Sequence, residues 1–229
     1  MVERSDPPKI VLYGPARAPY TEKVRRGLLL KGLPFELREP TGPEDFRRWN
    51  PETGLLPVLD LEGIRIIDST AILERLDDRF PDPPFLATDP RTADQQRQLE
   101  DWADESFLFY FMRWMRMAEE REQRRAANGD GRGPLRRLRS LGAWLRAGGT
   151  WERPHTALLR QIGARLDDLV GFLGARPFFY AERPSMADLA VYGMLCTLSR
   201  DSIPGSAGLL GERPVLVEYM RRLERETGG

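Results

Sequence analysis

The chain has few residues of several kinds, and each shortage excludes a class of function. It has one cysteine, Cys196, and one histidine, His155, among 229 residues. A single cysteine excludes an internal disulfide and fits a reducing compartment, and a single histidine excludes a metal site built from several imidazoles. Cys196 lies in the apolar stretch YGMLCTL, which predicts a core position. His155 follows Pro154 at a predicted helix start, which predicts a surface or capping position.

The chain also has no net charge of either sign. The 35 basic residues balance the 35 acidic ones, so no net field favours nucleic acid or an anionic membrane. No apolar run approaches the roughly 18 residues of a membrane span. The start, MVERSDPPKIV, lacks the apolar run of a signal peptide, and there is no glycine-rich phosphate loop. We therefore expect a soluble, cytoplasmic protein with no membrane segment and no nucleic-acid partner.

The first eighty residues alternate between the two hydrophobic periods typical of strands and helices. The pattern predicts strands at 9–13, 34–39, 56–60 and 64–67 and helices at 19–31, 42–50 and 68–80. Strands separated by helices indicate a parallel crossover, and the last two strands are joined by a short turn that indicates a hairpin. The predicted order is β-α-β-α-β-β-α.

The composition changes after residue 80. A proline-rich linker at 81–91 separates a domain at 1–80 from an all-helical domain at 92–229. Helical periodicity predicts four helices, at about 92–126, 154–174, 185–198 and 213–226. The arginine- and glycine-rich segment 119–151 predicts a solvated helix end, a flexible loop and a short amphipathic helix, with a partner or lid surface as the alternative.

In three short motifs, the residue types have a structural reason. In GLLPVLD (54–60), Pro57 begins a strand without an N–H to lose from the ladder, and its bond to Leu56 belongs to the class in which cis peptides occur. In DSTAI (68–72), Asp68 or Ser69 caps a helix whose first N–H groups suit a carboxylate, although plain capping needs no ligand. In SMAD (185–188), Ser185 and Asp188 fit a capping box, which predicts a structural role.

In this order and spacing, the three motifs resemble the cytosolic glutathione transferase superfamily over nearly the whole chain. The resemblance implies an α/β thioredoxin-like N-terminal domain, an all-α C-terminal domain and a homodimer. It also implies that glutathione binds as a substrate, without a metal. The main chain of Leu56, before Pro57, would pair with the cysteinyl part, while Asp68 and Ser69 would hold the γ-glutamyl end.

Two positions depart from the family pattern. Leu55 stands where many members have a lysine for the glycyl carboxylate, and the nearby alternatives are Arg47, Arg48 and Trp49. Ala18 stands where relatives carry the serine or cysteine that acts on the thiol, and Thr21 takes the place of a second cysteine.

These departures argue against thiol–disulfide chemistry by a cysteine of the protein. Tyr13 matches the catalytic tyrosine of some classes, and Arg17 offers a charge-assisted donor. The N–H groups of the first helix remain whatever the side chain at 18 is.

The second substrate is expected on the helical side of the interdomain cleft. The stretch 107–114 is rich in aromatic residues, and those expected to line the pocket are Phe107, Tyr110, Phe111 and Trp114, with core packing as the alternative. The function implied is conjugation of the glutathione thiolate to a small hydrophobic electrophile. The alternatives are a non-catalytic binding or scaffold protein of the same fold and, least favoured, an interaction module that uses 119–151.

Overall fold

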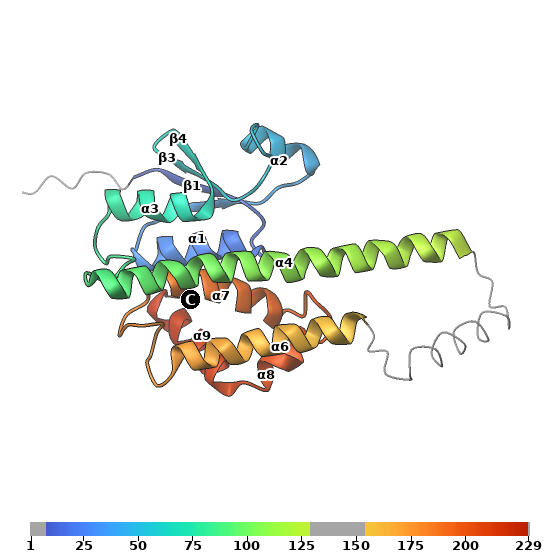
Figure 1. The fold of residues 1–229 in the computed structure, drawn as a ribbon. Coiled ribbons are helices and arrows are strands. Elements are labelled where there is room, and N and C mark those ends of the chain that lie inside the picture. The colour runs from blue at the N-terminus through green and yellow to red at the C-terminus, as the bar shows by residue number, and fades with distance from the viewer. Residues whose placement is uncertain (1–7, 129–153, 229) are drawn as a thin grey trace, which may run out of the picture.

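The computed structural model of the chain describes residues 8–128 and 154–228. The N-terminal half follows the predicted order of elements, which is confirmed (Figure 1). Its elements are β1 (Ile10–Tyr13), α1 (Pro19–Leu30), β2 (Glu36–Arg38), α2 (Pro43–Trp49), β3 (Val58–Leu61), β4 (Ile64–Ile67) and α3 (Ser69–Arg79). Pro19 occupies the first turn of α1, where its missing N–H costs no hydrogen bond.

The four strands form one mixed sheet in the order β2-β1-β3-β4. β1 runs parallel to β2 and antiparallel to β3, and β3 and β4 form the predicted antiparallel hairpin. Because side chains alternate along a strand, Leu12 and Leu59 face the core under α1 and α3. Tyr13 and Val58 face the opposite side, where they pack with Trp49 of α2.

The C-terminal half is all helical in the part that the structure describes. Its helices are α4 (Pro90–Asn128), α6 (Pro154–Leu173), α7 (Met186–Ser199), α8 (Ser206–Gly211) and α9 (Pro214–Glu226). The four predicted helices are confirmed, whereas α8 was not predicted because six residues are too few to establish a period. None of the described helices combines the length and the apolarity that a membrane crossing requires.

The predicted segment 119–151 falls partly outside the described residues. Its beginning is confirmed as a helix end, because α4 continues to Asn128. The loop and short amphipathic helix predicted after that point lie within 129–153, which the structure does not describe.

Helix α7 is the centre of the helical half, and all of its residues from Met186 to Leu198 are buried. It packs against both α1 and α4. At its start, Asp188 Oδ2 accepts hydrogen bonds from the main-chain N–H and the hydroxyl of Ser185, at 2.8 and 2.7 Å. Asp188 Oδ1 accepts from Phe179 N at 3.0 Å and from the Tyr219 hydroxyl at 3.1 Å. The predicted capping box is confirmed, and it ties the start of α7 to α9.

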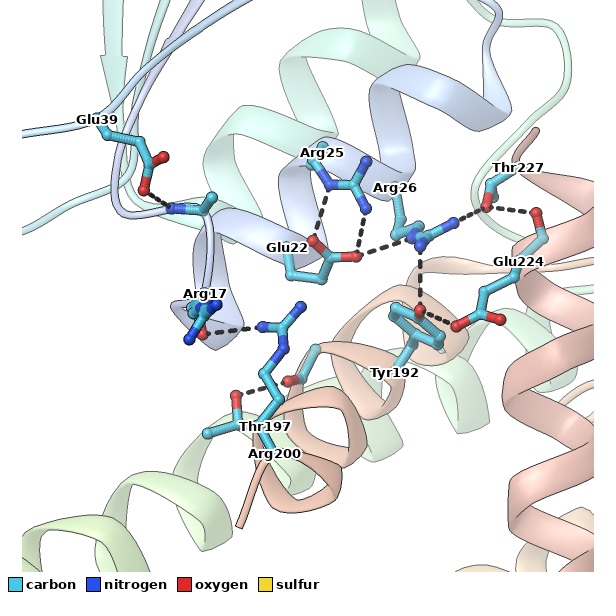
Figure 2. Close-up of polar contacts among 12 residues, drawn as sticks. Arg17, Glu22, Arg25, Arg26, Glu39, Tyr192, Thr197, Arg200, Glu224 and Thr227 are labelled. Carbon is cyan, nitrogen blue, oxygen red and sulfur yellow. Dashed lines mark hydrogen bonds and ion pairs between the residues drawn. The ribbon is translucent and has the colours of Figure 1, made fainter. Parts of the chain in front are cut away.

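The two halves meet where α1 crosses α7. A Cβ atom on Gly193 would collide with the carbonyl oxygen of Pro19, so the two backbones touch directly there. Beside this contact, the buried carboxylate of Glu22 on α1 accepts hydrogen bonds from Arg25 and Arg26. Figure 2 shows Arg26 reaching the hydroxyl of Tyr192 on α7, at 3.0 Å. The junction is therefore held by both close packing and buried polar contacts.

Candidate functional site

The strand register brings the sequence motifs to one end of the sheet. Tyr13 of β1 pairs with Val58 of β3, which in turn pairs with Ile67 of β4. Extending both pairings by two residues places Leu56 opposite Pro15 on one side and opposite Ser69 on the other. The loop before α1, the Leu56–Pro57 bond and the start of α3 are therefore neighbours across the sheet end.

The first turn of α1 lacks a side-chain cap. Its N-cap residue is Ala18, which has no side-chain acceptor, and the main-chain N–H of Ala18 bonds to Pro15 O at 2.9 Å. Pro19 has no N–H. Within the described residues no acceptor is found for the N–H groups of Tyr20 and Thr21. Two donors at the positive end of the helix dipole are thus free for an anion.

The two predicted catalytic side chains lie in different surroundings. Tyr13 is buried on the α2 side of the sheet, with its ring centroid 4.9 Å from that of Trp49. Guanidinium groups of Arg38 and Arg65 lie 5.8 and 5.7 Å from the same ring. Arg17 is exposed in the loop directly before α1. A catalytic role for either side chain stays a prediction, and only Arg17 is open to solvent.

The Leu56–Pro57 peptide bond is cis, as the motif allowed. Neither the N–H nor the C=O of Leu56 bonds to another group in the part of the chain that the structure describes. The preceding carbonyl is fixed instead, because Asn50 Nδ2 donates to Leu55 O at 2.9 Å and to Thr53 Oγ1 at 2.7 Å. Buried Asn50 was missed by sequence reasoning, and its only signal was its place at the end of the predicted helix 42–50.

Asp68 is the residue that caps α3. Its Oδ1 accepts from the N–H groups of Thr70 and Ala71, both at 3.0 Å. The Asp68 backbone adopts a positive φ of 73°. Ser69 is buried, and its hydroxyl makes no hydrogen bond to the other described residues. Asp68 therefore caps α3, while the hydroxyl of Ser69 remains available to bind another partner.

A buried ion cluster beside this helix start was not predicted. Lys23 on α1 is fully buried, and its ammonium pairs with Glu100 and, at 2.7 Å, with Asp104, both on α4. It also donates to Thr70 Oγ1 at 3.0 Å. Burial raises the pKa of Asp104 to about 6, although the Lys23 charge acts in the opposite direction. The cluster links α1, α3 and α4, and a sequence gives no sign of such a long-range pairing.

The aromatic residues of α4 expected in the second-substrate pocket pack mainly against the helical core. Phe107 is buried and stacks on Phe111, with ring centroids 6.0 Å apart. Tyr110 accepts a hydrogen bond from Arg165 Nε at 3.2 Å, and the ring of Trp114 lies 5.1 Å from that of His155. The exposed apolar side chains of this stretch are Leu108, Phe109, Met112 and Met115.

Helix geometry tells which of these side chains lie nearest to the sheet end. Asp104 faces α1, because it pairs with Lys23 and its carbonyl oxygen accepts from the Tyr20 hydroxyl at 3.1 Å. Leu108 and Phe111 follow Asp104 by four and seven residues and therefore lie on the same side of α4. They extend this face beyond the N-terminus of α1. The sequence alone does not distinguish the face with Leu108 and Phe111 from the face of α4 that packs on the helical core, because apolar residues occupy both faces.

The other residues considered in the sequence analysis differ in how exposed they are. Cys196 is buried, which confirms the core prediction, and burial raises the pKa of its thiol. His155 is half-buried against Trp114 rather than fully at the surface. Arg47 and Arg48 are exposed on α2, whereas Trp49 is buried under Tyr13. Leu55 is 70% exposed.

A four-stranded mixed sheet covered by three helices, followed by an all-helical half, is a thioredoxin-like domain joined to a helical domain. This is the glutathione transferase fold class. Known proteins place the chain within it. Residues 12–84 match the family model described as glutathione S-transferase, N-terminal domain. The chain is 38% identical over 87 residues to glutathione S-transferase Z2 of Arabidopsis thaliana, which covers 35% of this chain and 39% of that relative.

Two solved structures are similar over most of the chain. One is a rice glutathione S-transferase in complex with glutathione, with 24% identity, a TM-score of 0.68, and coverage of 96% of this chain and 88% of that one. The other is a glutathione S-transferase of Methylobacterium radiotolerans in complex with glutathione sulfonate, with 27% identity, a TM-score of 0.60, and coverage of 94% and 90%. In sequence, the chain spans between a third and a half of the length of the relatives that it matches. The comparisons therefore identify residues 12–84 as a glutathione S-transferase N-terminal domain and give the whole chain the glutathione transferase fold.

Proposed function

We propose that the protein binds glutathione at the end of the sheet and transfers its thiolate to an electrophilic acceptor. The observation that carries this proposal is the set of unpaired polar groups that the register gathers there. They are the N–H and C=O of Leu56, the hydroxyl of Ser69 and the N–H groups of Tyr20 and Thr21. Each is of a kind that an extended tripeptide with a carboxylate and a thiolate would satisfy.

The assignment of glutathione to these groups follows their order. Leu56 pairs with the cysteinyl main chain as an added strand would, and Ser69 binds the γ-glutamyl carboxylate. Asp68 uses Oδ1 for capping, which leaves Oδ2 for the ammonium group. At the glycyl end, Arg47 lines an open groove of about 510 Å³ together with Thr53 and Gly54. We assign the glycyl carboxylate to Arg47, in place of the lysine that Leu55 replaces.

The thiolate is stabilised without a side-chain hydroxyl at position 18. A free thiol has a pKa near 8.5, and donors at a helix N-terminus or a nearby cation lower it. We assign this role to the N–H groups of Tyr20 and Thr21 and to the guanidinium of Arg17. The thiol proton leaves to solvent, and the sulfur then forms a bond to the electrophilic carbon. A leaving group departs with its electron pair or, in an addition, a proton is taken up at the neighbouring atom.

The acceptor occupies the space beyond the N-terminus of α1. The apolar wall of this space is the row on α4 that includes Leu108 and Phe111, which continues past Asp104. Apolar contact there orients the acceptor toward the sulfur and excludes water from it. At the level of the whole protein, we propose a cytoplasmic homodimer.

The test combines glutathione binding with turnover. We expect calorimetry to detect binding at millimolar glutathione, and chlorodinitrobenzene to be conjugated. Ser69→Ala should weaken glutathione binding roughly tenfold because it removes a hydrogen bond to a charged group. Ser202→Ala, an exposed position on the helical half, is the matched control.

Each outcome has a clear meaning. Absence of binding by the native chain would refute the proposal and favour a scaffold protein of the same fold. Binding without conjugation would leave a glutathione-binding protein and remove the transfer step. Tyr13→Phe separates the catalytic assignments: unchanged turnover supports Arg17 and the α1 N–H groups, whereas a large loss assigns the step to Tyr13.

A further inference from the structure

Two arginines from different halves of the molecule meet at the loop before α1. Arg17 belongs to that loop, and Arg200 follows the last residue of α7. Arg200 Nη1 donates to the carbonyl oxygen of Arg17, over a long distance of 3.4 Å. Figure 2 shows both residues at the start of α1. Both side chains are exposed.

The described residues supply neither guanidinium with an acidic partner. Within residues 8–128 and 154–228, no ion pair is formed by Arg17 or Arg200. The neighbouring Arg25 and Arg26 differ, because both bind the carboxylate of Glu22. The carboxylate of Glu39, which follows β2, contacts this loop through its main chain, because it accepts from Ala16 N at 2.9 Å. In Figure 2 it lies at the opposite end of the loop from Arg200. Both guanidinium groups are therefore available to an anion beside the proposed thiolate position.

Exposed Leu108 on α4 offers an apolar surface at the same end of α1 as these charges. Arg200 lies one turn after buried Cys196 on α7, and α7 ends at the same end of α1 as the exposed Leu108 on α4. A purely hydrophobic acceptor would use the apolar wall and leave the Arg200 guanidinium without an anionic partner. An acceptor with an apolar body and one anionic group would use both features.

We propose that the second substrate carries an anionic group, a carboxylate or a sulfonate, which Arg200 binds next to Arg17 and the sulfur while its apolar body packs on α4. This inference rests on the proposed function, because it assigns the acceptor side of the same site. It makes Arg200 a specificity-determining residue. If Arg200 served only to cap the C-terminal end of α7, its removal would change stability but would not distinguish anionic from neutral ligands.

The test uses a matched pair of probes and needs no turnover. Anilinonaphthalene sulfonate and phenylnaphthylamine share an aromatic skeleton, and only the former is charged. The native protein should bind the sulfonate more tightly in a fluorescence titration without glutathione. Arg200→Gln should weaken sulfonate binding roughly five- to tenfold and leave the neutral probe unchanged. Arg200→Lys should retain part of the preference, and Arg221→Gln on α9 is the control.

Several results would overturn the inference. Equal affinity of the native protein for the two probes would do so, and so would an equal loss of both in Arg200→Gln, which indicates a structural effect. A stronger effect of Arg221→Gln would place the anion site elsewhere. Glutathione calorimetry on the same samples tests the proposed function separately. A negative result in the probe titration therefore does not decide whether glutathione binds, and a negative result in calorimetry does not decide whether Arg200 binds an anion. If the protein turns over chlorodinitrobenzene, the preference should also appear as a lower KM for chlorodinitrobenzoate, lost in Arg200→Gln.

Discussion

Replacement of Lys23 by methionine should destabilise the protein strongly and in a pH-dependent way. The Lys23 ammonium is enclosed by Glu100 and Asp104, and the side chains of Lys23 and Glu100 are 1% and 2% exposed. Methionine has a similar length and keeps the apolar packing of the stem, but it removes the ammonium group that contacts the two carboxylates. Removing one partner of a buried ion pair costs about 3–5 kcal/mol. We expect a loss of this size in the free energy of unfolding at about pH 7.5.

Acid should reverse part of the loss. The folded-state pKa of Asp104 is already raised to about 6 by burial. Without Lys23, the pKa of Asp104 should rise further, because the negative charge of Glu100 then acts on it without a counter-charge. A raised folded-state pKa means that the folded protein takes up protons more readily than the unfolded chain. Stability of the variant relative to the native protein should therefore increase as the pH falls toward about 5.

Urea unfolding followed by tryptophan fluorescence measures the effect at both pH values. Lys9→Met, at an exposed position, should change the free energy of unfolding by less than about 0.5 kcal/mol. The double variant Lys23→Met/Glu100→Gln should recover part of the loss, because one buried charge is neutralised. A loss below about 1 kcal/mol for Lys23→Met, or a loss that does not shrink in acid, would contradict the account of this cluster.

Two further predictions concern other buried polar groups. Asp188→Ala should cost about 3–5 kcal/mol of the free energy of unfolding, because it removes the cap of α7, leaves buried Phe179 N without its acceptor and leaves the Tyr219 hydroxyl only the main-chain oxygen of residue 188. A loss below that of Ser185→Ala in the same denaturation assay would be incompatible with this. Thr21→Val should stabilise the protein by about 1 kcal/mol, because the buried Thr21 hydroxyl has no partner among the described residues, and calorimetry should find its glutathione affinity unchanged. A clear loss of glutathione binding in that variant would give the Thr21 hydroxyl a role that its burial argues against.

The features predicted correctly from sequence are those set by local rules. Pro57 at a strand start, the cap of α3 and the Ser185–Asp188 box each depend on residues within a few positions of one another, so their residue types suffice. The class of the fold followed from the order of these local features.

The features that escaped prediction depend on distant segments. Lys23 reads as one charge on a helix, and only the crossing of α1 with α4 brings Glu100 and Asp104 to it. On α4, Phe111 was among the residues expected in the pocket, whereas Leu108 was not, because apolar side chains occupy more than one side of this helix. Likewise, nothing near Arg200 in the sequence indicates that it ends beside Arg17.

The contact between Gly193 and Pro19 has a mechanical consequence for how the site works. Because no side chain lies between them, the backbones of α1 and α7 are in direct contact at their crossing. We therefore expect a displacement of the last turns of α7 to displace the start of α1 as well. The residues assigned to the sulfur and those assigned to the acceptor then belong to one rigid unit rather than to two units that move relative to each other. We expect the arrival of an acceptor near Arg200 to be transmitted to the sulfur directly, without a hinge between the halves.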